Sequence, residues 1–132
     1  MNSDCYCALL RKASRRMTAL YDEALAPVGV NLAQFSLLRN ISWQQPVSLT
    51  DLARVVELDR STVGRNVKVL ARMGMTAAGV QDDGREATVV LTKKGRMVLN
   101  DGAPLWDAAQ ARVESAVGDH TSQVLHDLLA AL

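Results

Sequence analysis

The architecture of the chain follows from residues 48–92, which read SLTDLARVVELDRSTVGRNVKVLARMGMTAAGVQDDGREATVVLT. Ser48, followed three residues later by Asp51, is a helix-start signal, and a short apolar helical pattern comes after it. Asp59 is a favourable N-cap for a second, longer helix, which Gly74 is expected to end. A short helix, a turn and a longer helix in this order predict a helix-turn-helix.

The second helix of this motif has an apolar face and a polar face. Val63, Val67 and Leu70 recur at helical spacing and are expected to pack inward. Arginine can bond a guanine edge, asparagine can pair with an adenine edge, and serine, threonine and lysine bind phosphate oxygens. The side chains available for such contacts with DNA are Ser61, Thr62, Arg65, Asn66 and Lys68. The alternative is an ordinary solvated helix face, which the neighbouring helix and hairpin disfavour.

A polar hairpin follows this helix. Residues 87–91 contain a β-branched run that favours a strand, and residues 75–80 are its expected partner across a turn at 81–85. Within the turn, Asp83 stands two residues before Arg85 and can brace its guanidinium. A projecting arginine is attracted to a narrow minor groove of DNA. Considered in isolation, the pair would be a weak surface ion pair in an exposed turn.

Helical patterns flank the motif on its N-terminal side. Residues 5–25 have apolar side chains at three- and four-residue spacing and predict an amphipathic helix. Pro27 and Gly29 then break the chain. Asn31 and Gln34 form a capping-box pair that predicts the start of the next helix.

The C-terminal side also reads as helical. Thr92 can cap a helix that begins at Lys93, and we expect a kink or an interruption where this helix meets Gly102 and Pro104. Residues 118–119 separate a last short helix.

The two terminal regions carry more apolar positions than one small core needs, which favours a homodimer over burial within one chain. A dimer also doubles the base contacts, on a palindrome with a repeat of about 34–36 Å. The positions in question are Leu9, Leu10, Leu105, Trp106, Val124, Leu128, Leu129 and Leu132.

Composition places the chain among ordinary globular proteins. Its 132 residues are 48% hydrophobic and 22% charged, which suits one domain and excludes a disordered or collagen-like chain. The formal net charge of +1 argues against a polyanion binder, but it averages two unlike parts. Residues 1–100 carry 14 basic and 9 acidic side chains, whereas residues 101–132 carry one basic and five acidic ones. The basic excess therefore lies with the motif and predicts salt-sensitive DNA binding.

Sequence also favours a cytoplasmic location. No apolar run approaches the roughly 20 residues that a membrane span needs, so no membrane partner is expected. Residues 1–4 lack the pattern of a signal peptide. Cys5 and Cys7 are the two cysteines, and unpaired thiols suit a reducing compartment.

Residues 48–96 resemble the winged helix-turn-helix of the multiple-antibiotic-resistance regulators, the MarR family. The matching stretches are LTDLA at 49–53, LDRSTV at 58–63, VLARMG at 69–74, and DGR at 83–85 followed by LTKKG at 91–95. The resemblance implies a homodimeric DNA-binding regulator, usually a repressor, that acts on a palindromic operator. Its second motif helix would enter the major groove, and its wing pair, Asp83 and Arg85, would serve the minor groove.

The same resemblance implies a mainly α fold with a small β wing. Residues 1–132 would form one winged helix-turn-helix domain, with DNA-binding motif and wing at 48–92. Residues 1–30 and 93–132 would supply the dimerisation helices. The sequence departs from the family at residues 75–78, MTAA, where many members have a more β-branched strand with a basic residue.

The first helix resembles the organic-hydroperoxide-sensing branch of that family. Cys7 falls on the sensing cysteine, and Tyr21 falls on a tyrosine that hydrogen-bonds it. A helix start also favours the thiolate form, which peroxides oxidise to sulfenic acid. Leu32 and Phe35 depart from the branch, because tyrosines commonly stand at or near these positions, and no C-terminal cysteine is present.

Three regulatory signals therefore remain open. The first is oxidation at Cys7 or Cys5. The second is binding of a small aromatic or phenolic ligand, which is the commonest mode in the wider family. In the third, the cysteines are inert and the signal is a different one. Neither a cofactor nor a metal is expected, because His120 and His126 fall on different helix faces and the cysteines lack a second ligand pair.

Two other classes of protein are disfavoured. A thiol peroxidase would need a basic residue beside its cysteine, and no phosphate loop or nucleophile elbow is present, so no enzyme is expected. An adaptor or DNA mimic that binds only protein would be expected to lose Arg65 and Lys68, which are retained.

Overall fold

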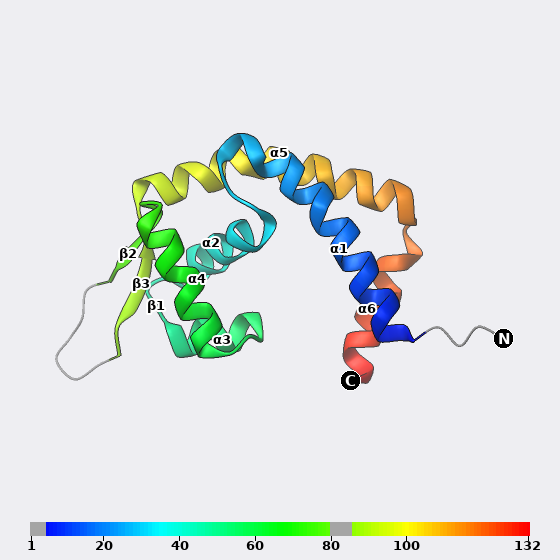
Figure 1. Cartoon of the computed structure of the whole chain (residues 1–132), viewed down its shortest axis with the longest axis horizontal. Coiled ribbons are helices and arrows are strands. Elements are labelled where there is room, and N and C mark those ends of the chain that lie inside the picture. Colours follow the sequence, from blue (N-terminus) through cyan, green and yellow to red (C-terminus); the bar gives the residue numbers. More distant parts are fainter. Residues whose placement is uncertain (1–4, 80–85) are drawn as a thin grey trace.

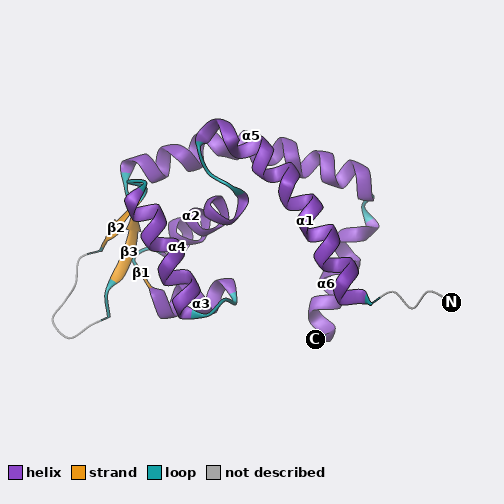
Figure 2. Cartoon of the chain, viewed as in Figure 1, coloured by secondary structure: helices purple, strands orange, loops and turns teal. Residues whose placement is uncertain are grey.

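The computed structural model describes residues 5–79 and 86–132. Their elements, in order, are α1 (Tyr6–Leu25), the 3-10 turn η1 (Ala26–Val28), α2 (Leu32–Gln44), β1 (Val47–Ser48), α3 (Leu49–Val56), α4 (Arg60–Arg72), β2 (Thr76–Ala78), β3 (Thr88–Leu91), α5 (Lys93–Val117) and α6 (His120–Ala131). Helices predominate over a small sheet, so the predicted mainly α fold is confirmed (Figure 2).

The elements form an arch with two legs (Figure 1). One leg holds α2, α3, α4 and the sheet, α5 forms the crest, and the other leg holds α6 and the N-terminal half of α1. The contacts between α1 and α5, and between α2 and α5, join the legs to the crest. The helix-turn-helix and the N-terminal half of α1 with α6 therefore lie on different legs of the arch.

Side-chain caps begin four of the helices where the sequence predicts them. Each capping oxygen accepts a hydrogen bond from a backbone N–H in the first turn, and α2 has the reciprocal capping box with Gln34. The capping residues are Asn31, Ser48, Asp59 and Thr92.

The sheet has three strands rather than the two of the predicted hairpin. Its order is β1-β3-β2, and both neighbouring pairs are antiparallel. The added strand, β1, pairs Val47 with Val89 and Ser48 with Thr88. Two residues are too few to show the alternation by which a strand is recognised in sequence, so β1 was missed.

The interruption expected in the long C-terminal helix is absent, because α5 continues through Gly102 and Pro104 as one helix. Proline removes a single N–H donor from the helix ladder. Gly102 is buried against Phe35, and a Cβ at this position would lie 2.6 Å from the ring atom Cε1. The missing side chain thus allows α5 to cross α2 closely, and this packing supports the helix on both sides of the proline.

The main hydrophobic core lies in the leg that holds the helix-turn-helix. Val63, Val67 and Leu70 are buried there, as their spacing predicts. The same cluster includes the fully buried Phe35 of α2 and Leu52 of α3. A second, smaller cluster of Tyr21, Ala109 and Val113 joins α1 to α5.

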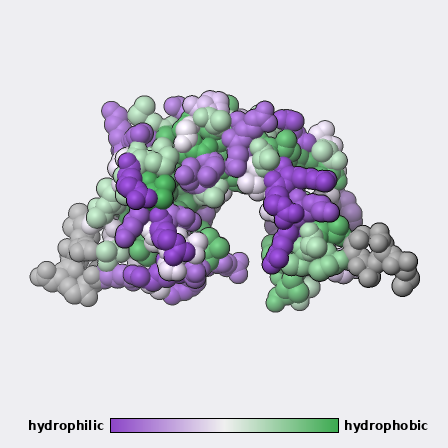
Figure 3. All heavy atoms as spheres, viewed as in Figure 1, coloured by the Kyte–Doolittle hydropathy of each residue, from purple (hydrophilic) through white to green (hydrophobic). Residues whose placement is uncertain are grey.

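The apolar surplus of the terminal helices is smaller than the sequence suggests. Leu105 and Trp106 pack against the main core, so for these two residues the prediction of a surface outside the monomer core is wrong. Long-range packing of α5 on α2 decides this, and helical spacing cannot show it. Other apolar residues remain exposed on the leg of α1 and α6 and at the end of α5 that adjoins it: Tyr6, Leu9, Leu10, Val117, Val124, Leu125, Leu129 and Leu132. Figure 3 shows hydrophobic atoms gathered at the tip of the leg.

Among residues 5–79 and 86–132, no helix is both long enough and apolar enough to cross a membrane.

Candidate nucleic-acid interface

A tight turn sets the direction of α4. Glu57, between α3 and α4, adopts a left-handed conformation with φ of 55°, and its N–H donates to the carbonyl of Ala53. The carboxylate of Asp59 then caps α4 by accepting from the N–H of Thr62 at 2.9 Å. With Val63 and Leu70 buried, the rotation of α4 about its axis is fixed.

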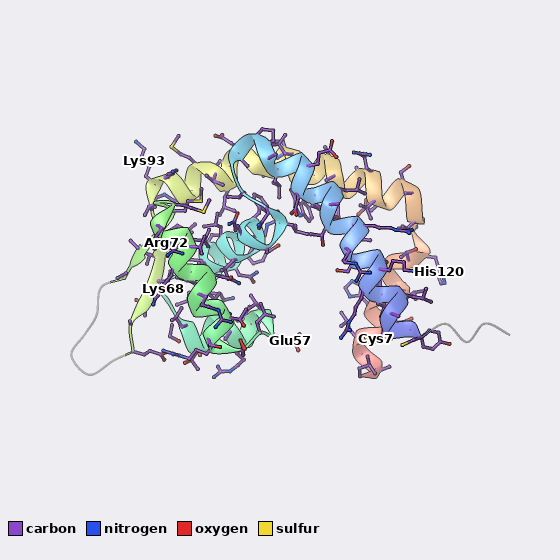
Figure 4. All side chains as sticks on the ribbon, in the orientation of Figure 1. Cys7, Glu57, Lys68, Arg72, Lys93 and His120 are labelled. Atoms are coloured by element: carbon purple, nitrogen blue, oxygen red, sulfur yellow. The ribbon has the colours of Figure 1, made fainter. Side chains whose placement is uncertain are left out.

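The outward face of α4 is a polar and basic stripe. Its residues are spaced by three or four positions, so they lie in one row along the helix. They are Ser61, Arg65, Lys68 and Arg72, and all four are exposed. The structure thus brings together three of the residues predicted to contact DNA and adds Arg72, one turn beyond Lys68 (Figure 4). The same helical count would have found Arg72 from the sequence.

The other two predicted contacts lie off this stripe. Thr62 is half-buried, and its hydroxyl oxygen accepts a hydrogen bond from Arg65 at 3.4 Å. Asn66 is exposed on the flank of α4 that faces α2, where it borders a hollow with Ala33 and Leu37. The structure therefore does not place Asn66 beside Arg65 and Lys68.

An ion pair and a hydrogen bond join the base of the wing to the two motif helices. Glu86, just before β3, lies 3.4 Å from the guanidinium nitrogen of Arg60 at the start of α4. The same carboxylate accepts a hydrogen bond from the hydroxyl of Thr50 on α3 at 2.9 Å. Between α4 and the strands lies a groove of about 620 Å³, bordered by Arg60, Arg65 and Lys68. Sequence reasoning missed Arg60 and Glu86, because their contact spans 26 residues.

Hydrogen bonds to Asp59, the N-cap of α4, also change the pKa of its carboxyl group. Those from Thr62 have the largest effect and lower the pKa of the Asp59 carboxyl below its usual value. Desolvation opposes them, while the charge of Arg65 and a hydrogen bond from Ser61 lower the pKa further. A charged cap also suits the positive N-terminal end of α4.

The predicted wing pair, Asp83 and Arg85, lies outside the described residues.

The thiols lie on the opposite leg of the arch from Lys68 and Arg72 (Figure 4). Cys5 is the N-cap residue of α1 and Cys7 lies in its first turn, and both are exposed. No group of three metal-ligating side chains that could hold an ion is found among residues 5–79 and 86–132.

The hydrogen bond expected between Cys7 and Tyr21 is not formed within the chain. The two residues stand 14 positions apart on one continuous helix, about 21 Å along its axis. The hydroxyl of Tyr21 instead donates to the side-chain oxygen of Gln110 on α5. Burial, together with the charge of Glu114, raises the pKa of Tyr21 above its usual value.

Comparison with known proteins agrees with this arrangement. The family model for the MarR family matches residues 30–76, which include the whole of α2, α3 and α4. The crystal structure of the Mycobacterium tuberculosis transcriptional regulator MosR is 32% identical, with 98% of this chain and 96% of that one covered and a TM-score of 0.83. The chain belongs to the MarR family. It is therefore a DNA-binding transcriptional regulator, and the regulators of this family are dimeric DNA binders rather than enzymes.

Two further structures extend the comparison. MosR of M. tuberculosis in complex with DNA is 35% identical, with 97% of this chain and 96% of that one covered and a TM-score of 0.86. CouR from Rhodococcus jostii RHA1, bound to p-coumaroyl-CoA, is 24% identical, with 96% and 90% covered and a TM-score of 0.77, which shows a shared fold. No curated protein sequence matches the chain.

Proposed function

We propose that the protein is a homodimeric repressor that binds a palindromic operator through α4 and is released when Cys7 is oxidised. The observation that carries the DNA-binding part is the exposed row of Ser61, Arg65, Lys68 and Arg72 on a helix whose opposite face is buried. Such a row presents donors both to base edges and to phosphates. The MosR–DNA complex shows that a relative with this fold binds DNA.

A second copy of the chain is the partner that the terminal helices favour. The leg formed by α1 and α6 leaves most of its apolar side chains exposed, with Leu129 at 71% and Leu9 at 45%. The N-terminal half of α1 carries four exposed cations, Arg11, Lys12, Arg15 and Arg16, whereas residues 101–132 are acidic. The apolar area of this leg and the opposite net charges of α1 and residues 101–132 suit pairing between two copies, which doubles the contacts with DNA. We place this dimer in the cytoplasm.

Oxidation at Cys7 supplies a release signal on that interface. After losing its proton, the exposed sulfur attacks the terminal oxygen of an organic hydroperoxide, and the O–O bond breaks. The sulfur becomes a sulfenic acid, and the departing alkoxide takes up a proton and leaves as an alcohol. Cys7 lies in the first turn of α1, within the surface that we assign to the partner copy. A change of charge and hydrogen bonding there would alter how the two DNA-binding legs are held apart. The partner's α1 could also bring Tyr21 near Cys7, since one chain alone does not.

Ligand control is a second candidate. CouR, of the same fold, binds p-coumaroyl-CoA, and this chain has a cleft between α2 and α5 with two arginines and a tryptophan in its walls. Under this alternative, the protein binds the same operator through α4, but an aromatic molecule, rather than oxidation of Cys7, releases it.

Selection of bound DNA from a random pool, with and without cumene hydroperoxide, tests both parts. We expect enrichment of a two-fold symmetric sequence by the reduced protein and its loss after oxidation. The Cys7→Ser variant should bind the same sequence and keep it in peroxide, while Cys5→Ser is the matched control that should still release. Peroxide release that survives in Cys7→Ser would contradict the role of Cys7, and the absence of any enriched sequence would contradict operator binding.

A further inference from the structure

One acidic side chain pairs with a cation of the groove between α4 and the strands (Figure 1). The groove is bordered by Arg60, Arg65 and Lys68, and no carboxylate is found among the described residues that line it. Glu86 reaches Arg60 from just outside the groove, because it stands at the base of the wing. Its charge therefore opposes that of a surface otherwise suited to a polyanion.

The two contacts of Glu86 differ in strength. Its oxygen Oε1 accepts from the hydroxyl of Thr50 at 2.9 Å, which is an ordinary hydrogen-bond length. The contact with Nη2 of Arg60 is single and longer, at 3.4 Å, and the two side chains are 41% and 60% exposed. An exposed pair without the two parallel bonds of a guanidinium fork contributes little. Thr50 therefore fixes the carboxylate in place, and Arg60 is the partner that is free to leave.

Arg60 is well placed to bind a phosphate. It is the first residue of α4, at the end where the helix dipole is positive. Gly64, one turn further on, has no side chain to cover the groove, and Lys68 follows about 12 Å from Arg60 along the helix axis. A phosphate accepts two charge-assisted hydrogen bonds from one guanidinium. Such a contact is stronger than the single long contact that Arg60 makes with Glu86.

We propose that Glu86 restrains Arg60 in the free protein and that Arg60 moves from this carboxylate to a backbone phosphate when DNA docks. The exchange rests on the proposed function, because it requires α4 to lie on DNA. Breaking the ion pair offsets part of the new phosphate contact, so Glu86 lowers the affinity for DNA of any sequence. Glu86 is thus a positioning residue, and Arg60 is the group that touches DNA. A limited phosphate affinity leaves the choice of site to the base contacts of α4.

Two single variants of the full chain test the exchange against the selected operator and a random duplex, by fluorescence anisotropy over a range of salt. Glu86→Gln removes the charge and keeps an oxygen for Thr50. It should bind both duplexes about two- to fivefold more tightly, which corresponds to the loss of an exposed ion pair. Arg60→Ala should weaken both complexes and lower the slope of log affinity against log salt by about 0.9. An unchanged slope would show that Arg60 meets no phosphate and would overturn the proposal.

The double variant Arg60→Ala/Glu86→Gln separates release of Arg60 from a general effect of charge. It should bind DNA as Arg60→Ala does, because the gain acts through Arg60. Asp51→Asn is the matched control, since it removes the carboxylate of another exposed ion pair of the helix-turn-helix, which lies 3.0 Å from Arg54. It should not reproduce the gain. A gain that persists in the double variant, or one of equal size in Asp51→Asn, would overturn the proposal.

A measurement on the parent protein keeps the proposal falsifiable if Glu86→Gln is poorly folded. The side-chain Nε–H signal of Arg60, assigned by its absence in Arg60→Ala, should shift in the nitrogen-15 spectrum when DNA is added. A signal that stays in place would show that Arg60 does not change partners. If no operator is enriched from a random pool, the proposed function fails, and the random duplex still tests the exchange. If the operator is bound but Glu86→Gln changes nothing, the exchange fails and the proposed function stands.

Discussion

The hydroxyl of Tyr21 on α1 donates a hydrogen bond to the side-chain oxygen of Gln110 on α5, across 89 residues of sequence. The amide of Gln110 donates in turn to Glu114 at 3.4 Å. Tyr21 is buried with Ala109 and Val113, so this polar chain crosses the small cluster that fastens the leg of α1 to the crest. The aromatic ring of Trp106, whose centroid is 6.1 Å from that of Tyr21, extends the contact toward the main core.

Removing this hydroxyl should weaken the attachment of α1. We expect Tyr21→Phe to lower the free energy of unfolding by about 0.5–1.5 kcal/mol at neutral pH, the net value of one hydrogen bond. Chemical denaturation measures this. Tyr6→Phe on the same helix is the matched control, because Tyr6 is 83% exposed and should show no change.

The effect of Tyr21→Phe should also depend on pH. Burial and the charge of Glu114 raise the pKa of Tyr21 above 10.0, so the folded state favours the neutral phenol. A raised pKa stabilises the fold fully below pH 10.0, and this contribution is lost as the pH rises through the pKa of the folded state. The advantage of the parent over Tyr21→Phe should therefore shrink above pH 10.0. An advantage that grew with alkaline pH would contradict the burial of the hydroxyl.

Replacing each of two helical glycines by alanine should change the free energy of unfolding in opposite directions. In Gly102→Ala the new Cβ would lie 2.6 Å from the ring of Phe35, which is fully buried and has little room to move. We expect a loss of about 1–3 kcal/mol in the free energy of unfolding from this overpacking. In Gly64→Ala the nearest atom is the Leu49 methyl at 3.7 Å, so the better helix propensity of alanine should add about 0.5–1 kcal/mol. Thermal and chemical denaturation of both variants distinguishes these signs.

Local signals in the sequence predicted most of the fold. A cap needs only an acceptor side chain and an N–H three residues later, so Asn31, Ser48, Asp59 and Thr92 could be recognised without the rest of the chain. The buried face of α4 followed from spacing alone in the same way. Such features depend on contacts within one helical turn, and the residues that make them are adjacent in the sequence.

Contacts between distant segments account for what was missed. The strand β1 exists because Val47 pairs with Val89, and the burial of Trp106 depends on how α5 crosses α2. Arg60 meets Glu86 only because the wing folds back onto α4. The helical wheel alone would have placed Asn66 off the exposed row of α4, and it would have added Arg72 to that row. Cys7 and Tyr21 do not meet within the chain, because both lie on the one continuous helix α1, 14 positions apart.

Acid should selectively weaken the cap of α4. Hydrogen bonds from Thr62 and Ser61, with the charge of Arg65, hold the pKa of Asp59 below 3.8. A lowered pKa stabilises the fold above pH 3.8, and this contribution is lost as the pH falls through the pKa of the folded state. Asp59→Asn keeps a capping oxygen without the charge, so its deficit relative to the parent at neutral pH should narrow in acid. A deficit that is constant from neutral pH down to about pH 3 would show that the charge of Asp59 contributes nothing to the cap.

Arg65 should contribute to the choice of base. It lies in the middle of the exposed row of α4, where a guanidinium can bond a guanine edge through two donors. Arg65→Ala should weaken operator binding by about 1–3 kcal/mol and relax the preference at one position of each half-site. Selection from a random pool measures both effects. Uniform weakening across all sequences would instead assign Arg65 to the phosphate backbone.

Lys68 and Arg72 should contribute affinity without base preference. They follow Arg65 along the same exposed row, and neutralising a phosphate releases counterions whichever base is present. Lys68→Ala and Arg72→Ala should each weaken binding to operator and random DNA by the same factor. The slope of log affinity against log salt should fall by about 0.9 for each phosphate that the variant no longer neutralises. Arg112→Ala, which removes an exposed cation from the far half of α5, is the charge-matched control and should leave the slope unchanged. If Arg112→Ala lowered the slope as much as Lys68→Ala, the general charge of the chain, rather than the row on α4, would account for its affinity for DNA.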